Sequence, residues 1–160
     1  MIFTTTTGAG RLVEAWGAAV VLMGAPTNAT AVACAAVGLA IGGARDIVIV
    51  PAGLMGDPGF DAQEDRVAAV LIARRCMELA QMRGLNLCLG EGGDLYDYWL
   101  PRIETEGVEA LFQSAPHSEK LRLIDKASDI VLCAQVDTVA AVPVGWGWDR
   151  HPLGVVLRKG

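Results

Sequence analysis

Short apolar runs alternate with helical patterns through the first half of the chain, and this alternation constrains the fold most. Residues 18–24 (AAVVLMG) and 46–51 (DIVIVP) lack polar alternation, which is typical of strands covered on both faces of a parallel sheet. Residues 1–7 are predicted as a further strand. Helices are predicted after these strands, over residues 10–16, 29–41 and 62–82. The order β-α-β-α-β-α predicts an α/β fold, a three-layer α/β/α arrangement with a mostly parallel sheet.

The rest of the chain carries shorter patterns. We predict helices at residues 107–113 and 118–126, strands at 130–134 and 139–144, and an irregular tail over 145–160. A length of 160 residues suits one domain. Residues 1–160 are therefore predicted to form a single α/β domain.

Composition narrows the partners. A hydrophobic fraction of 52% is high for a small domain, which has much surface to cover with polar groups. We therefore expect apolar surface to be buried against another part of the polypeptide or against a partner subunit, as in a homo-oligomer. The net charge of −5 and the lack of a basic stripe argue against a nucleic-acid or membrane partner. The apolar stretch 29–44 falls short of the ~20 residues that span a bilayer and is predicted to be a buried helix. With no basic leader at the N-terminus, we expect a cytoplasmic protein.

The four cysteines show no paired spacing. Cys34, Cys76 and Cys133 each lie in an apolar run, where a free thiol behaves as a small core hydrophobe. Scattered thiols without a metal or disulfide pattern fit a reducing cytoplasm.

A threonine-rich loop is the first candidate site. Thr4 to Thr7 end the first predicted strand, and Gly8 opens a helix, so hydroxyls and backbone N–H groups can converge there on an anion. Such a site also needs a cation, which either Arg11 or a metal would supply. The alternative is that β-branched threonines simply suit a strand.

An acidic pair is the second candidate. Glu64 and Asp65 lie in the first turn of the long predicted helix, where two carboxylates can bind Mg²⁺ or can merely stabilise the helix dipole. Asn28 has a similar ambiguity between a helix N-cap and a ligand-binding group. His117 and His151 are expected to be lone, exposed side chains.

Four segments, taken in order, resemble the 2-phosphosulfolactate phosphatase (ComB-like) family. Residues 4–10 (TTTTGAG) look like its TTTNGTR segment, and residues 28–33 (NATAVA) look like its N-A-[ST]-A-V-A segment. Residues 47–53 (IVIVPAG), followed by Glu64-Asp65, resemble its I-V-C-A-G … E-D-x-x-A-A-G stretch. Residues 118–143, with DIVLCAQVD and a later Val-Pro, resemble its closing pattern.

This resemblance implies a ComB-like phosphatase fold and a phosphoric monoester hydrolase. Such an enzyme would use Mg²⁺ to hydrolyse the phosphate ester of a small sulfonated or carboxylated hydroxy acid, 2-phosphosulfolactate to sulfolactate in a coenzyme M-type pathway. Glu64 and Asp65 would be the catalytic and metal-binding residues. The small anionic phospho-metabolite would be bound by Thr5, Thr6, Thr7, Gly8, Arg11, Asn28 and Gly53.

The chain also departs from the family pattern. The family's amino-terminal D-V-x-R-A-[ST]-T-T segment has no counterpart, so the resemblance covers the C-terminal two-thirds of a family member. Thr7, Ala9 and Gly10 stand where the family has Asn, Thr and Arg, although Arg11 follows one position later. These changes leave an alternative open: a catalytically weakened relative that binds an anionic metabolite or serves as a subunit.

Overall fold

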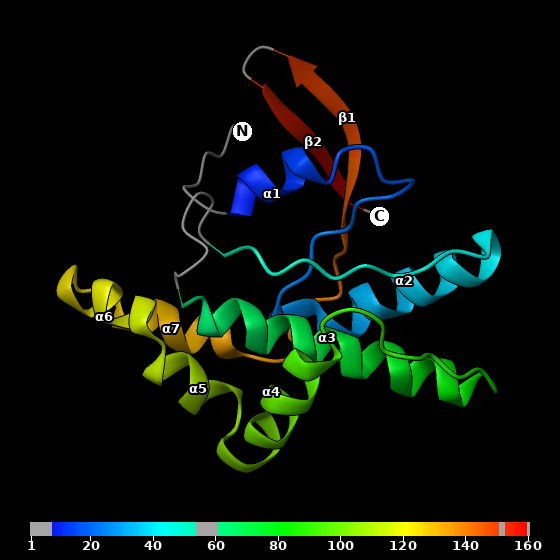
Figure 1. Cartoon of the computed structure of the whole chain (residues 1–160). Coiled ribbons are helices and arrows are strands. Elements are labelled where there is room, and N and C mark those ends of the chain that lie inside the picture. The colour runs from blue at the N-terminus through cyan, green and yellow to red at the C-terminus, as the bar shows by residue number, and fades with distance from the viewer. Residues whose placement is uncertain (1–7, 54–60, 151–152, 160) are drawn as a thin grey trace.

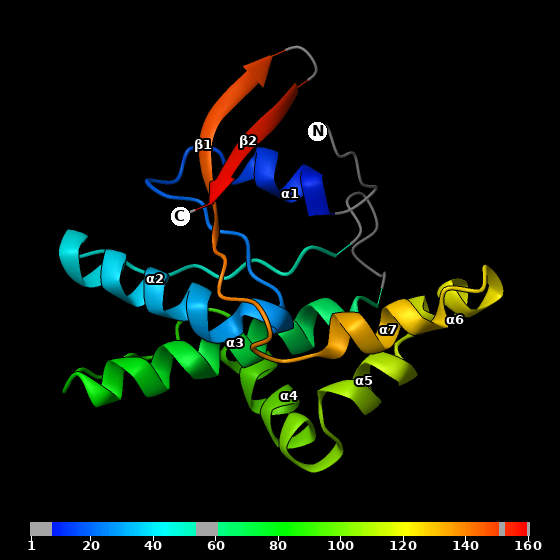
Figure 2. The same ribbon diagram turned by 180° about the vertical axis from the view of Figure 1, so that it is seen from behind.

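A computed structural model describes residues 8–53, 61–150 and 153–159 of the chain, and helices dominate them (Figure 1). The helical elements are α1 (Gly8–Glu14), the 3₁₀ turn η1 (Pro26–Asn28), α2 (Ala29–Gly43), α3 (Gln63–Met82), α4 (Gly93–Glu106), α5 (Val108–Ser114), α6 (Pro116–Leu123) and α7 (Ala127–Ala134). The strands are β1 (Pro143–Arg150) and β2 (Leu153–Lys159), which pair antiparallel with an irregular register between Gly145 and Gly147. Figure 2 shows this hairpin and α1 on one side of the body formed by α2 to α7.

The predicted three-layer α/β/α fold with a mostly parallel sheet is wrong for the described residues, whose one sheet is the two-stranded hairpin. Residues 46–51 run extended without joining a ladder, and residues 18–24 contribute only a bridge from Leu22 to Val144. The physical reason is that a strand needs neighbours to pair its backbone groups, and apolar composition cannot specify them. The segment 46–51 buries only one face, because Ile47 packs on the core while Val48 is 81% exposed.

Two further sequence expectations need correction. Residues 130–134, predicted as a strand, belong to α7, and the predicted irregular tail 145–160 is largely the β1–β2 hairpin. A short apolar run does not distinguish a strand from a turn of buried helix, which explains the first error. The helices predicted over 29–41 and 62–82 are confirmed as α2 and α3. The strand predicted over 1–7 lies outside the described residues.

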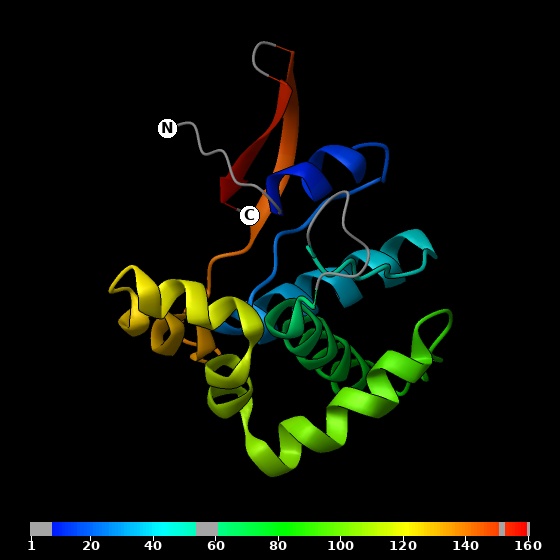
Figure 3. The ribbon, with the colours of Figure 1, turned by 60° about the vertical axis from the view of Figure 1, so that its left-hand side comes forward.

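Buried apolar side chains form two clusters on different faces of α3. The first cluster joins α3 to α2 and Val142, and its members are Ala29, Val32, Ala33, Val37, Leu71, Ile72, Cys76 and Val142. The second cluster joins α3 to α4, α5 and α7, and its members are Val67, Val70, Trp99, Ile103, Leu111, Phe112, Ile130 and Ala134. Figure 3 shows α4 beneath α3, with α5, α6 and α7 gathered near the start of α3. The start of α3 is therefore held from several sides.

The helix α2 is apolar on every side but is covered on one. Residues Pro26–Gly43 are long and apolar enough to cross a membrane by length and composition, a test that core helices also pass. Here α2 packs along α3 (Figure 1), while Leu39 and Ile41 are exposed. The predicted burial of this helix is therefore confirmed for one face of its first part, up to Val37, and is wrong for its last residues.

The same partial covering corrects the expectation for the thiols. Cys76 is buried in the first cluster, but Cys34 and Cys133 are exposed. In a helix that is apolar all round, sequence alone does not reveal which face will pack.

A connection between distant parts of the chain fixes the start of α2. The Asp137 carboxylate accepts the Thr30 backbone N–H at 2.6 Å and the Thr30 hydroxyl at 2.8 Å, across 107 residues of sequence. Arg75 of α3 lies 3.6 Å from the same carboxylate. Asp137 therefore supplies the N-terminal cap of α2, and it holds α2, α3 and the lead into β1 together.

Candidate functional site

The acidic pair lies where the sequence places it, in the first turn of α3. The N-cap residue of this helix is Ala62, which makes no side-chain capping bond. Both carboxylates instead contact groups outside α3: Asp65 contacts Gly53, and Glu64 contacts His117. The favourable interaction with the helix dipole remains, but capping alone does not describe these two side chains.

Asp65 and Arg11 converge on the loop that precedes α3. The Gly53 N–H donates to the Asp65 Oδ2 atom at 2.9 Å, and the Arg11 Nε–H donates to the Ala52 carbonyl oxygen at 2.9 Å. Gly53 has a φ of +58°, and a Cβ built there would lie 4.0 Å from Arg11 Nη2. Glycine suits this left-handed conformation, so the sequence permits the carboxylate, the guanidinium and the peptide to meet.

Burial sets the ionisation of Asp65. Removal from water raises the pKa of this carboxyl above its usual value, and the neighbouring Glu64 charge raises it further. The hydrogen bond from the Gly53 N–H and the nearby His117 act in the opposite direction. Burial has the largest effect, so this carboxylate gains from any cation that approaches it.

Glu64 has one partnered and one unpartnered oxygen. Its Oε1 atom lies 3.1 Å from the His117 Nδ1 atom, which α6 brings from 53 residues away. Its Oε2 atom is buried and has no hydrogen-bond partner among the residues that the structure describes. An orphaned carboxylate oxygen is costly, and it marks the place where a further group would be stabilising.

Sequence reasoning missed His117. Its polar surroundings suggested a lone exposed histidine, and its side chain is indeed 41% exposed. Its contact with Glu64 depends on the packing of α5 against α3 and of α6 against α5, which no local pattern specifies. The Pro-His pair at the start of α6 indicates a helix N-terminus but not a partner.

Asn28 has a structural role. Its Nδ2 group donates to the carbonyl oxygens of Met23 at 3.3 Å and Ala141 at 2.9 Å, and its Oδ1 atom accepts the Ala25 N–H at 2.8 Å. It occupies the N-cap position of α2 without a side-chain capping bond. Both amide hydrogens are thus engaged with backbone, which leaves neither for an anion.

The predicted residues of the threonine-rich loop do not join the site in the described part of the chain. Thr5, Thr6 and Thr7 lie outside the described residues. Gly8 begins α1, a helix of 7 residues. Among the residues that the structure describes, it brings together four of the predicted set, Arg11, Gly53, Glu64 and Asp65, and adds His117.

Mg²⁺ prefers oxygen ligands, and the first turn of α3 supplies two carboxylates. Within the described ranges, no three His, Cys, Asp or Glu side chains are grouped to hold a metal. Mg²⁺ is nevertheless bound in many proteins by one or two carboxylates, with water and phosphate oxygens completing its shell. The orphaned Glu64 Oε2 atom beside Asp65 fits that mode of binding.

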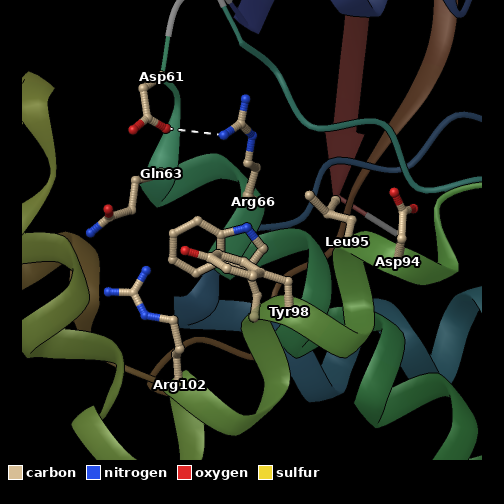
Figure 4. Close-up of a pocket in the computed structure, with 8 residues that line it drawn as sticks. Asp61, Gln63, Arg66, Asp94, Leu95, Tyr98 and Arg102 are labelled. Carbon is tan, nitrogen blue, oxygen red and sulfur yellow. Dashed lines mark hydrogen bonds and ion pairs between the residues drawn. The ribbon is translucent and has the colours of Figure 1, made fainter.

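A separate hollow of about 550 Å³ opens between the start of α3 and α4 (Figure 4). It is lined by Asp61, Gln63, Arg66, Asp94, Leu95, Tyr98, Trp99 and Arg102. Arg66 pairs with Asp61 at 3.1 Å, and the Arg102 guanidinium lies 4.7 Å from the Trp99 ring centre while pairing with Glu106. The lining charges balance, so this hollow lacks the excess positive charge that a phosphate ester requires.

Comparison with known proteins gives one family. The 2-phosphosulpholactate phosphatase family matches the chain over residues 1–146. No curated protein matches the chain.

Proposed function

This chain belongs to the 2-phosphosulpholactate phosphatase family, and we propose that it is a Mg²⁺-dependent phosphatase. Its substrate would be the phosphate ester of a small sulfonated or carboxylated hydroxy acid, with 2-phosphosulfolactate the first candidate and sulfolactate the product of a coenzyme M-type pathway. The observation that carries this proposal is the first turn of α3, where Glu64 Oε2 is buried with no hydrogen-bond partner among the described residues and where Asp65 is the next residue.

The proposed reaction is the hydrolysis of a phosphate monoester by water. A water oxygen forms a bond to phosphorus, the bond between phosphorus and the ester oxygen breaks, and the leaving oxygen gains a proton. The products are inorganic phosphate and the hydroxy acid. Bound Mg²⁺ would neutralise charge on the phosphoryl oxygens.

The residues of the chain have distinct roles in this proposal. Glu64 and Asp65 would hold the metal, and both are half-buried at the start of α3, where their contacts with His117 and Gly53 orient them. Arg11 and the Gly53 peptide would face the anionic substrate. The guanidinium already fixes the Ala52 carbonyl, so its charge is positioned before substrate arrives.

A phosphate-release assay tests the proposal. Purified full-length chain is incubated with 2-phosphosulfolactate or phospholactate, with Mg²⁺ or with EDTA. We expect release with Mg²⁺ only, and we expect Glu64→Gln or Asp65→Asn to reduce the rate more than the ~10–100-fold that loss of an outer-shell partner causes. Glu109→Gln is the control, because Glu109 is also an acid in a helix first turn, that of α5. Equal rates in all variants would refute the assigned site.

A second candidate function is favoured by the changed threonine segment. Thr7, Ala9 and Gly10 replace an Asn, a Thr and an Arg of the family pattern, and Arg11 is engaged by Ala52 and by Glu14 at 2.6 Å. Weaker anion donors would give a catalytically weakened relative that binds a phospho-metabolite. Calorimetric binding of phospholactate without any phosphate release would support this second function over the first.

A further inference from the structure

Two consecutive residues of α3 tie its first turn to the α5–α6 connection. Gln63 Nε2 donates to the Leu111 carbonyl at 2.6 Å and to the Ser114 hydroxyl at 2.9 Å, while Glu64 Oε1 meets His117 Nδ1 at 3.1 Å. Gln63 is 8% exposed. The first turn of α3 is therefore positioned by side-chain bonds from residues 111–117 as well as by its own helix.

The α6 start that carries His117 is itself well fixed. The Ser118 hydroxyl donates to the Phe112 carbonyl at 2.5 Å, and the Ser118 N–H donates to the Ala115 carbonyl at 2.9 Å. Ser118 is 6% exposed and Phe112 belongs to the second cluster. His117 thus approaches Glu64 from a connection anchored in the core.

We propose that His117 is a positioning residue, which holds Glu64 Oε1 so that Oε2 is presented for metal binding. A carboxylate only accepts hydrogen bonds, so the contact requires the ring form with a hydrogen on Nδ1. The hydrogen bond fixes the carboxylate plane, and Oε2 is the oxygen that is buried without a partner. Outer-shell partners of this kind commonly orient carboxylate ligands. This inference rests on the proposed function, because it takes Glu64 as a metal ligand.

Metal binding without substrate tests the inference separately from turnover. The full chain is titrated with Mn²⁺, a paramagnetic substitute for Mg²⁺, and free Mn²⁺ is followed by electron paramagnetic resonance. We expect His117→Ala to weaken Mn²⁺ binding by ~10-fold or more. His117→Asn should retain binding within a few-fold, because the Asn amide nitrogen can occupy the position of Nδ1. Circular dichroism establishes that each variant is folded.

A matched control and a second disruption complete the design. Glu119→Gln alters an exposed acid of the same helix, paired with Arg122 at 3.2 Å, and should leave Mn²⁺ binding unchanged. If His117→Ala does not fold, His117→Gln replaces it, since Gln moves the amide donor farther from the backbone and should also weaken binding.

The outcomes separate the two proposals. Wild-type Mn²⁺ affinity in a folded His117→Ala or His117→Gln chain would overturn the positioning role and leave the phosphatase proposal standing. Absence of Mn²⁺ binding by the wild-type chain would overturn the positioning role as well, because Glu64 would then have no metal to meet. Failure of the phosphatase proposal appears instead as absence of phosphate release from every substrate.

Discussion

The two core clusters meet on α3 but are built differently. The second cluster is helix against helix, with Leu111 and Ile130 at 0% and 1% exposure. The first cluster is helix against helix on one side and extended chain on the other, where Ile47 and Ile49 pack but Val48 stays 81% exposed. A helix pairs its own backbone N–H and C=O groups wherever it packs. An extended segment can cover a core with one face while the side chains of its other face remain exposed to solvent.

The largest expected effect is in the second cluster. Leu111→Ala should lower the free energy of unfolding by about 2–5 kcal/mol, because a fully covered site cannot collapse around the cavity. Leu39→Ala, on the exposed side of α2 at 46% exposure, should change it by less than about 0.5 kcal/mol. Urea unfolding followed by circular dichroism measures both. Comparable losses for the two variants would show that Leu111 is packed no more tightly than the exposed Leu39.

The first cluster is tested by a substitution that adds volume. A Cβ on Gly24 would lie 2.7 Å from Ile72 Cδ1 and 3.2 Å from Val32 Cγ1. Gly24→Ala should therefore destabilise the chain by about 1–3 kcal/mol. Adding Ile72→Val removes the nearest atom, so the double variant should lose less than the sum of the single losses. If the two losses in unfolding free energy are strictly additive, the segment that carries Gly24 does not press on Ile72 of α3.

The reactivity of the thiols reports how far solvent and reagents reach Cys76 in the first cluster. Burial raises the pKa of the Cys76 thiol to about 11, so little thiolate forms near pH 8. Cys34 and Cys88 are exposed. Iodoacetamide labelling of the native chain, read by mass spectrometry of peptides, should modify these two well before Cys76. Early labelling of Cys76 would mean that the first cluster opens readily.

The smallest effect concerns Asp65, in the first turn of α3. Its raised pKa, due mainly to burial, means that the stability associated with the protonated form is complete below the unfolded value near 3.8 and is lost as pH rises through the folded pKa. Asp65→Asn keeps an acceptor for the Gly53 N–H but does not ionise. The variant should therefore gain stability relative to wild type between pH 4 and pH 7 in urea unfolding at both values. Parallel pH profiles would contradict the burial of this carboxyl.

Local patterns predicted the two long helices α2 and α3 well, but they mistook α7 for a strand and predicted a parallel sheet that the described residues lack. Asn28 and the glycines at 42–43 predicted the bounds of α2, and the spacing of apolar residues with a closing glycine predicted α3, because a helix is determined by neighbours in sequence. The run at 46–51 is equally apolar, but pairing it requires a partner that no local pattern names. Sequence-based hypotheses likewise placed Glu64 and Asp65 at a helix start, whereas the Glu64–His117 contact crosses 53 residues.

The long-range bonds at the start of α2 have a consequence for the order of folding. Asn28 bonds to Ala141 across 113 residues, and Thr30 bonds to Asp137 across 107. Closing such loops costs more chain entropy than forming helices locally. We therefore expect α3 to α7 to form first and the start of α2 to be secured last. On the ribosome, Thr30 of α2 is made 107 residues before Asp137, which caps the helix, and Asn28 is made 113 residues before its partner Ala141, so this apolar helix emerges long before its final contacts can form.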